Sequence, residues 1–207
     1  PEERGRRVGR AAIAYCYRFY WICARLSGLM RIEAEALDVL RDQPGGLIVA
    51  ANHPSLLDAM LIVARLPRSV CVMKASLARN VFLGAGARLA RYIANDSPRH
   101  MVRTAVEGLR RGDQLVLFPE GTRSPGPRRL HPLSRSIALI ALRANVPIQT
   151  VLIETDSPYL GKGWPLWRLP PIPIVFRARL GERFEPQADQ DALIARIEAY
   201  FEQELRP

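Results

Sequence analysis

Short apolar runs alternate with segments of helical spacing from residue 46 to the end of the chain, and this alternation limits the fold more than any other feature. Short runs of this kind suit strands that are buried on both faces. Strands and helices in alternation predict a single α/β domain with a largely parallel central sheet flanked by helices. The expected strands are 46–51, 69–73, 114–118, 148–153 and 172–180, and the expected helices are 54–66, 78–91, 99–111, 132–144 and 188–205.

The apolar stretch AAIAYCYRFYWICARLSGLM (11–30) has the length of a membrane span but contains Arg18 and Arg25. On an insertion scale the two arginines cost roughly 5 kcal/mol, whereas the larger apolar side chains return about 2 kcal/mol. The arginines share one face, so the stretch is predicted to be an amphipathic helix that lies in the membrane interface. The alternative is a helix that packs on the domain with its arginines in solvent. The predicted domains are 1–31, basic and membrane-associating, and 32–207.

The net charge is +10 and is carried almost wholly by arginine, because Lys74 and Lys162 are the only lysines. A balance this basic indicates an anionic partner, which is a nucleic acid, an anionic lipid or a phosphate-bearing substrate. The basic residues are scattered and no nucleic-acid-binding signature is present, so a nucleic-acid-binding protein is a remote alternative. The three cysteines lack metal-ligand spacing, which disfavours a zinc site or a disulfide framework.

His53 and Asp58 stand in the segment NHPSLLD, directly after the first predicted strand. Helical side chains lean toward the N-terminus, so Asp58 is predicted to reach back to the imidazole of His53. A carboxylate on one ring nitrogen fixes the tautomer and leaves the other nitrogen free to act as a general base. The alternative is structural: Asn52 or Ser55 caps the helix, Asp58 favours the helix dipole, and His53 has no special role.

A second polar segment, LFPEGTRS (117–124), follows the strand predicted at 114–118. It is expected to open onto the same edge of the sheet as His53. Gly121 permits a tight turn and close approach of a ligand, and Arg123 offers a guanidinium fork that suits phosphate. Taken alone, the segment is also typical of a turn with an exposed ion pair.

Together the two segments resemble the glycerophospholipid acyltransferase family, of the lysophosphatidic acid acyltransferase type. Asn52, His53 and Asp58 match the N-H-x4-D motif of that family, and residues 118–124 match its F-P-E-G-T-R-S motif. Two motifs in the expected order and strand context are far more specific than either alone.

Weaker matches extend the resemblance over residues 32–185. The segment VPIQTVLIE (146–154) is similar to a later V-P-I block of the family, and Lys74 is similar to a lysine that often follows the second strand. The residues to which the resemblance assigns substrate binding are Asn52, Lys74, Glu120, Gly121, Thr122 and Arg123.

The resemblance implies an O-acyltransferase that moves a fatty acyl group from acyl-CoA or acyl carrier protein to a lysophospholipid hydroxyl, with 1-acylglycerol-3-phosphate as the expected acceptor. His53 would take the hydroxyl proton and Asp58 would orient the imidazole. Arg123 would bind phosphate, while Glu120 and Gly121 would shape the acceptor site. No metal, other cofactor or acyl-enzyme is expected. The implied partner is membrane lipid, and the implied location is the cytoplasmic face of the inner membrane, as a peripheral protein.

One block departs from the family pattern. An arginine usually occupies the middle block G-x-I-F-I-x-R, whereas here Asn95 and Asp96 stand at the basic position. Arg91, Arg99 or Arg103 are the candidate substitutes. The departure leaves open an acceptor other than a glycerol phosphate, such as a specialised lipid or pigment of an ornithine-lipid or aryl-polyene type pathway.

The segment TDSPYLGKGWPLWRLPPIP (155–173) interrupts the alternation of strands and helices. Loops of this length are often functional. Its two tryptophans, Trp164 and Trp167, either pack down on the domain or form a second membrane contact or part of an acyl-chain pocket.

Overall fold

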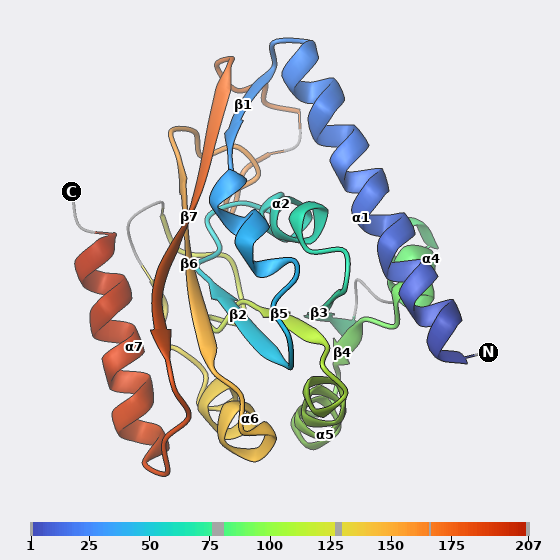
Figure 1. Ribbon diagram of the computed structural model, residues 1–207. Helices are drawn as coiled ribbons and strands as arrows, with labels where there is room; N and C mark the ends of the chain where they lie inside the picture. The colour runs from blue at the N-terminus through green and yellow to red at the C-terminus, as the bar shows by residue number, and fades with distance from the viewer. Residues whose placement is uncertain (1, 76–80, 127–129, 166, 206–207) are drawn as a thin grey trace.

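The computed structural model describes residues 2–75, 81–126, 130–165 and 167–205, so the start of the helix predicted at 78–91 lies outside the described residues. A seven-stranded sheet carries helices on both faces (Figure 1). This arrangement confirms the predicted α/β class. In chain order the elements are α1 (Glu2–Leu26), β1 (Met30–Glu33), η1 (Glu35–Leu40), β2 (Leu47–Ala51), α2 (Asp58–Arg65), β3 (Ser69–Lys74), α4 (Val81–Ala90), β4 (Ile93–Asn95), α5 (Pro98–Arg110), β5 (Gln114–Leu117), α6 (Ser136–Ala144), β6 (Ile148–Thr155), β7 (Ile174–Phe184) and α7 (Gln190–Glu204).

The strands lie in the order β1-β7-β6-β2-β5-β3-β4, and every adjacent pair is parallel except β6 with β7. β2 lies at the centre, between β5 and β6. All its residues are buried, which explains its unbroken apolar sequence. Because β2, β3, β5 and β6 run in the same direction, their carboxyl ends share one edge of the sheet. Open α/β sheets form their ligand sites at that edge.

Side chains of the central strands alternate between two apolar cores, one on each face of the sheet. Ile48 and Ala50 of β2 join the core that α5, α6 and α7 cover. Leu47, Val49 and Ala51 join the core that α1, η1 and α2 cover. The central strand is therefore held from both sides, and its carboxyl end has a fixed position.

The helix starts differ from the sequence predictions. α2 begins at Asp58 rather than at residue 54, because the preceding residues form a turn in which the Asp58 carboxylate accepts the backbone N–H of Ser55 (2.7 Å). α6 begins at Ser136 rather than at residue 132, and it ends before Asn145 as predicted. Asn145 has φ of 54°, a left-handed conformation that asparagine tolerates. The strands β1 and β4 were not predicted, since so few residues carry too little pattern.

The inner face of α1 attaches this helix to the domain. The helix begins well before residue 11, where the apolar stretch starts, and packs against α2 and α4. Trp21 and Ala24 are buried in the core beneath it. Arg10 is also buried, and its guanidinium binds both carboxylate oxygens of Asp113, at 2.7 and 3.2 Å. A paired and desolvated arginine at this position fixes the helix relative to the sheet.

The outer face of α1 presents an apolar row to solvent. Arg18 and Arg25 are exposed on the same helix. α1 thus packs on the domain with Arg18 and Arg25 in solvent, which was the alternative to a helix in the membrane interface. It also keeps an exposed apolar face, which a helix in the membrane interface requires. Among the described residues, no helix combines the length and apolar character needed to cross a membrane. The exposed apolar side chains of the row are Val8, Tyr15, Phe19, Ile22 and Leu26.

Candidate active site

Asn52 fixes the end of β2 to β6. Its side-chain nitrogen donates to the carbonyl oxygen of Ile153 (2.8 Å), and its side-chain oxygen accepts the N–H of Ile153 (2.7 Å). Asn52 is buried and does not cap α2. Both polar ends of its amide are used inside the protein, so Asn52 holds the backbone that leads to His53.

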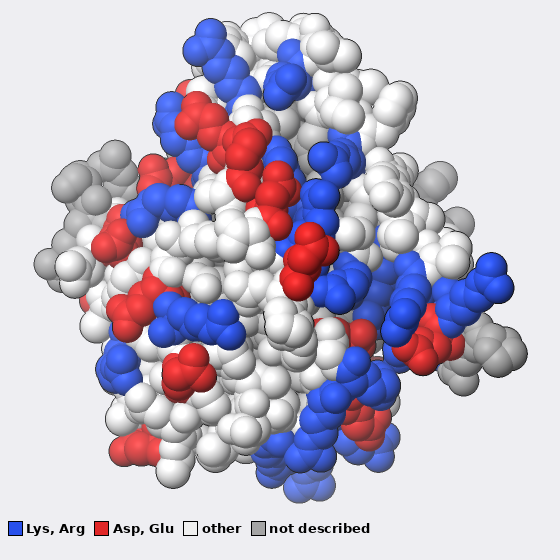
Figure 2. All heavy atoms as spheres, in the orientation of Figure 1, with Lys and Arg blue, Asp and Glu red and all other residues white. Residues whose placement is uncertain are grey.

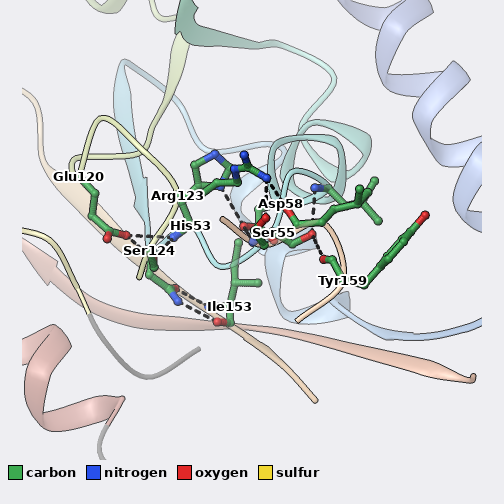
Figure 3. Close-up of polar contacts among 12 residues, drawn as sticks. His53, Ser55, Asp58, Glu120, Arg123, Ser124, Ile153 and Tyr159 are labelled. Carbon is green, nitrogen blue, oxygen red and sulfur yellow. Dashed lines mark hydrogen bonds and ion pairs between the residues drawn. The ribbon is translucent and has the colours of Figure 1, made fainter. Parts of the chain in front are cut away.

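His53 and Asp58 meet directly after this point. The Nδ1 atom of His53 lies 2.9 Å from Oδ2 of Asp58, and the same oxygen accepts the N–H of Ser55. The ring of His53 stacks on Phe118, with centroids 4.1 Å apart. With a proton on Nδ1 donated to the carboxylate, Nε2 is left as a base, and the imidazole is still partly exposed. Figure 3 shows His53, Ser55 and Asp58 gathered between Glu120 and Tyr159.

Asp58 is a buried acid with a raised pKa. Its side chain is fully buried, and this desolvation raises the pKa of Asp58, while the hydrogen bond with His53 acts in the opposite direction. Its Oδ1 atom is buried and has no hydrogen-bond partner among the described residues. A carboxylate with one unsatisfied oxygen gains from a proton or from a positive charge beside it. An imidazolium at His53 would supply that charge.

Glu120 ties the second motif to the first. One carboxylate oxygen accepts the backbone N–H of His53 (3.2 Å) and the hydroxyl of Ser124 (2.5 Å). The other accepts the backbone N–H of His131 (2.9 Å). The backbone N–H of Ser124 also donates to the carbonyl oxygen of His53 (2.8 Å). Sequence reasoning assigned Glu120 to the substrate, but its buried carboxylate is occupied by the chain itself, which is a positioning arrangement.

The next three residues of the motif differ in their surroundings. Gly121 has φ of 65°, is exposed, and would meet nothing within 4 Å if it carried a Cβ. Its glycine is therefore required by the turn rather than by crowding. Thr122 is half-buried. Arg123 donates through Nη1 to the carbonyl oxygens of Leu160 (2.8 Å) and Gly161 (2.7 Å), so part of its guanidinium holds a loop.

That loop belongs to the segment 155–173 and forms one wall of the site, a role that the sequence did not reveal. The hydroxyl of Ser55 donates to the carbonyl oxygen of Tyr159 (3.0 Å), and the N–H of Leu56 donates to the carbonyl oxygen of Leu160 (3.1 Å). The loop thus lies against the turn that carries His53. Both contacts end on backbone carbonyl groups of a distant segment, and no residue pattern predicts them.

Two basic side chains meet beside these motifs. Nζ of Lys162 lies 3.4 Å from Nε2 of His131, next to the carbonyl of Gly161 that Arg123 holds. Neither side chain forms an ion pair with a carboxylate in the described part of the chain. Unneutralised basic groups at a sheet edge suit an anion.

Lys74 lies apart from this network. It is exposed at the end of β3, and its register partner in β4 is Asn95, which stands where the family pattern has a basic residue. Among the candidate substitutes, Arg99 is exposed, and Arg103 is exposed beside Glu107, with a nitrogen-to-oxygen distance of 4.0 Å. Lys74 therefore lies on the same sheet edge as His53, and the described residues show no hydrogen bond between the two side chains. Within the described residues, no group of three or more acidic, histidine or cysteine side chains is arranged to hold a metal ion.

Known proteins are similar to this chain in sequence. A model of the family described as Acyltransferase matches residues 31–154. A curated 1-acyl-sn-glycerol-3-phosphate acyltransferase from Limnanthes alba is 30% identical over 137 residues, which are 63% of this chain and 48% of the relative. A curated protein of the same description from Helicobacter pylori is 28% identical over 115 residues, 53% of this chain and 48% of that relative. The chain spans about half the length of the curated relatives it matches.

A solved structure has a similar fold. The crystal structure of the 1-acyl-sn-glycerophosphate (LPA) acyltransferase PlsC from Thermotoga maritima superimposes with a TM-score of 0.72. The match covers 95% of this chain and 79% of that chain at 22% sequence identity. This likeness supports the α/β architecture, including the long N-terminal helix.

Proposed function

Because this chain belongs to the acyltransferase family, we propose that it transfers a fatty acyl group from a thioester to a hydroxyl of a lysophospholipid, with 1-acylglycerol-3-phosphate as the first acceptor to test. The single observation that carries the proposal is the contact of His53 with Asp58 at the sheet edge, 2.9 Å between Nδ1 and Oδ2. The descriptions of the curated relatives support the choice of acceptor.

The proposed reaction is a direct transfer. Nε2 of His53 takes the proton of the acceptor hydroxyl as its oxygen attacks the thioester carbonyl carbon. The carbonyl electrons move to oxygen, return, and expel the thiolate of CoA or of acyl carrier protein, which receives the proton from His53. The buried Asp58 stabilises the imidazolium between these steps. Gly121 would shape the acceptor site at this exposed turn. The chemistry requires neither metal nor acyl-enzyme.

Phosphate binding is assigned to cations around the site. Arg123 uses Nη1 for the loop carbonyls and keeps its other guanidinium nitrogens for a ligand. Lys162 and His131, whose side chains meet beside Arg123, are the next candidates. Lys74 is the more distant candidate. Glu120 and Asn52 act by positioning, because their polar atoms are used within the chain.

Membrane binding is assigned to residues 1–31, as a segment distinct from the catalytic domain 32–207. The exposed apolar row of α1 would enter the interface of a bilayer at the cytoplasmic face of the inner membrane, and the exposed Arg18 and Arg25 would meet anionic headgroups. Lysolipid acceptors and acylated products reside in the bilayer, so an enzyme held on its surface exchanges both with it directly.

Asn95 favours a second candidate within the same reaction class. It is exposed and sits beside Lys74 at the position where the family pattern has a basic residue. An uncharged amide there suits an acceptor whose headgroup is not a glycerol phosphate, as in a specialised lipid or pigment pathway.

An acceptor panel tests the proposal. The protein is incubated with acyl-CoA or acyl carrier protein thioester and with lysophosphatidate, other lysolipids and non-glycerol acceptors, and products are identified by mass spectrometry. We expect turnover of lysophosphatidate that falls about 10²- to 10⁴-fold in His53→Ala and is kept in the control His100→Ala, whose exposed histidine lies on α5. Turnover of a non-glycerol acceptor alone would select the second candidate. A stoichiometric burst of protein-bound acyl group with donor alone would refute direct transfer.

A further inference from the structure

The two tryptophans of the segment 155–173 have opposite environments. Trp164 is half-buried, its ring packs edge-on against Tyr159, and its Nε1 donates to the carbonyl oxygen of Arg168 (3.1 Å). The guanidinium of Arg168 lies over the same ring, 4.9 Å from its centroid. Trp164 thus builds the base of the loop. Trp167 is 87% exposed, and the described residues offer its indole nitrogen no hydrogen bond.

Trp167 has two apolar neighbours that are exposed to a similar degree. Leu169 is 89% exposed and Ile172 is 63% exposed, and we call these three side chains the 167–172 tip. Exposed single apolar residues are ordinary, but three large ones on a loop whose base is firmly packed indicate a contact surface. Such exposure also excludes the tip from lining an acyl-chain pocket, because pocket walls are enclosed.

The tip lies next to the end of α1. The N–H of Ile174, two residues after Ile172, donates to the carbonyl oxygen of Leu29 (3.0 Å), and β1 pairs with β7 from this point. Tyr159 at the base of the loop is close to Tyr20 of α1, and after burial its proximity is the second cause that raises the pKa of Tyr20. Figure 1 shows the β6–β7 loop at the same end of the molecule as the last turn of α1. In Figure 2 the surface at that end of the molecule combines uncharged and basic side chains.

We propose that the 167–172 tip is a second membrane-insertion point, separate from α1, that enters the headgroup region of an anionic bilayer. Tryptophan prefers this region because its ring is apolar and its N–H is polar, and leucine and isoleucine add apolar area. Arg168, between Trp167 and Leu169, is exposed and adds a positive charge at the tip, which suits an anionic lipid surface. A bilayer fits the tip better than a protein partner does, since its three side chains carry a large apolar area and a single polar group, the indole N–H of Trp167.

The position of the tip has a consequence that rests on the proposed function. Its base is bound to the turn of His53 through Ser55 and Tyr159, and to Arg123 through the carbonyl oxygen of Gly161. Insertion at the tip and along α1 gives two contacts, which define the orientation of a rigid domain on a surface. The site would then face the membrane at a constant distance, so that an acceptor reaches His53 without leaving the bilayer.

The test uses the full chain and vesicles of phosphatidylglycerol and phosphatidylethanolamine, with no substrate, so that its outcome is independent of any acyltransferase activity. Sedimentation measures vesicle affinity for the wild type, for the triple variant Trp167→Ser, Leu169→Ser, Ile172→Ser, and for the control Leu142→Ser on α6 at another side of the molecule. We expect the triple variant to lose on the order of tenfold in affinity, because about 1.4 kcal/mol of apolar transfer corresponds to tenfold. Leu142→Ser should bind like the wild type, and both variants should melt like it.

A second measurement locates the tip in the bilayer. Lipids brominated in the acyl chains should quench the fluorescence of the wild type on binding, and Trp167→Phe should lose most of that quenching, since Trp21 is buried and Trp164 is packed at the loop base. Unchanged vesicle affinity of the triple variant, or equal quenching of Trp167→Phe, would overturn the proposal. So would normal vesicle binding combined with a raised KM for acyl carrier protein, which would assign the tip to a protein partner.

Discussion

Two loops at the carboxyl edge of the sheet differ in which kind of side chain they bury and which they expose. The loop after β5 turns polar groups inward: Glu120 and Ser124 are buried, and each bonds to the backbone at His53. The loop after β6 turns apolar groups outward at Trp167 and Leu169. Burying charge and exposing apolar surface both cost free energy, so each loop deviates from what stability alone favours. The first deviation suits chemistry at a fixed base, and the second suits a lipid surface.

The largest expected effect comes from a substitution in the His53–Asp58 pair, on which the polar half of this comparison depends. Asp58→Asn keeps the shape but loses the negative charge that supports an imidazolium, so the acyl-transfer rate should fall about 10²- to 10⁴-fold. Acidification protonates the His53–Asp58 pair and removes its base, so the wild-type rate should fall at low pH. Asp58→Asn should shift the pH midpoint of that fall, because the carboxylate no longer stabilises the imidazolium. A pH–rate profile with the same acid limb in Asp58→Asn would remove Asp58 from the mechanism.

The raised pKa of Asp58 should also make the free energy of unfolding depend on pH. The unfolded chain loses the Asp58 proton near the usual value, about 3.9, while the folded chain keeps it to higher pH. Ionisation therefore costs folding free energy as the pH rises through the folded-state pKa. The unfolding free energy of the wild type, relative to that of Asp58→Asn, should decrease as the pH rises from the ordinary aspartate value of about 3.9 through the raised pKa of Asp58, as urea titrations at each pH would report. A constant difference would contradict the burial effect.

Much of this arrangement was readable in the sequence, and the rest was not, for physical reasons. The contact of Asp58 with His53 is local, so spacing and the lean of helical side chains predicted it. The alternation of apolar runs predicted the central strands, because both faces of β2 are covered. Glu120 holds two loops together because its carboxylate accepts the backbone N–H groups of His53 and His131. Only the folded chain brings these residues together, so the sequence did not show this role. The opposite environments of Trp164 and Trp167 likewise follow from packing at the loop base, which no residue pattern encodes.

Glu120 gives an effect of intermediate size, and its substitution separates positioning from catalysis. Glu120→Gln puts an amide nitrogen where a carboxylate oxygen accepts either from His53 and Ser124 or from His131, so at least one part-buried donor of this network loses its carboxylate acceptor. The variant should lose about 1–3 kcal/mol of unfolding free energy and tens-fold in kcat, with both losses in the same protein. Glu107→Gln, at an exposed position on α5, is the matched control and should change neither quantity. A kcat loss without a change in melting temperature would instead point to a direct role for Glu120 at the substrate.

Substitution of Lys162 should give the smallest effect on activity. Lys162 lies between the two regions, because it follows Gly161, whose carbonyl oxygen Arg123 binds, and precedes Trp164 by two residues. Its ammonium is exposed and its only described neighbour is His131, so Lys162→Ala should raise the KM of a phosphate-bearing substrate about threefold to tenfold and leave kcat unchanged. The exposed Arg143 of α6 provides the control Arg143→Ala. A KM change with lysophosphatidate but not with monoacylglycerol assigns the cation to the acceptor, whereas a change with acyl-CoA alone assigns it to the donor. Equal KM values for every substrate would restrict Lys162 to the loop surface, and the polar region of the site would then end at Arg123.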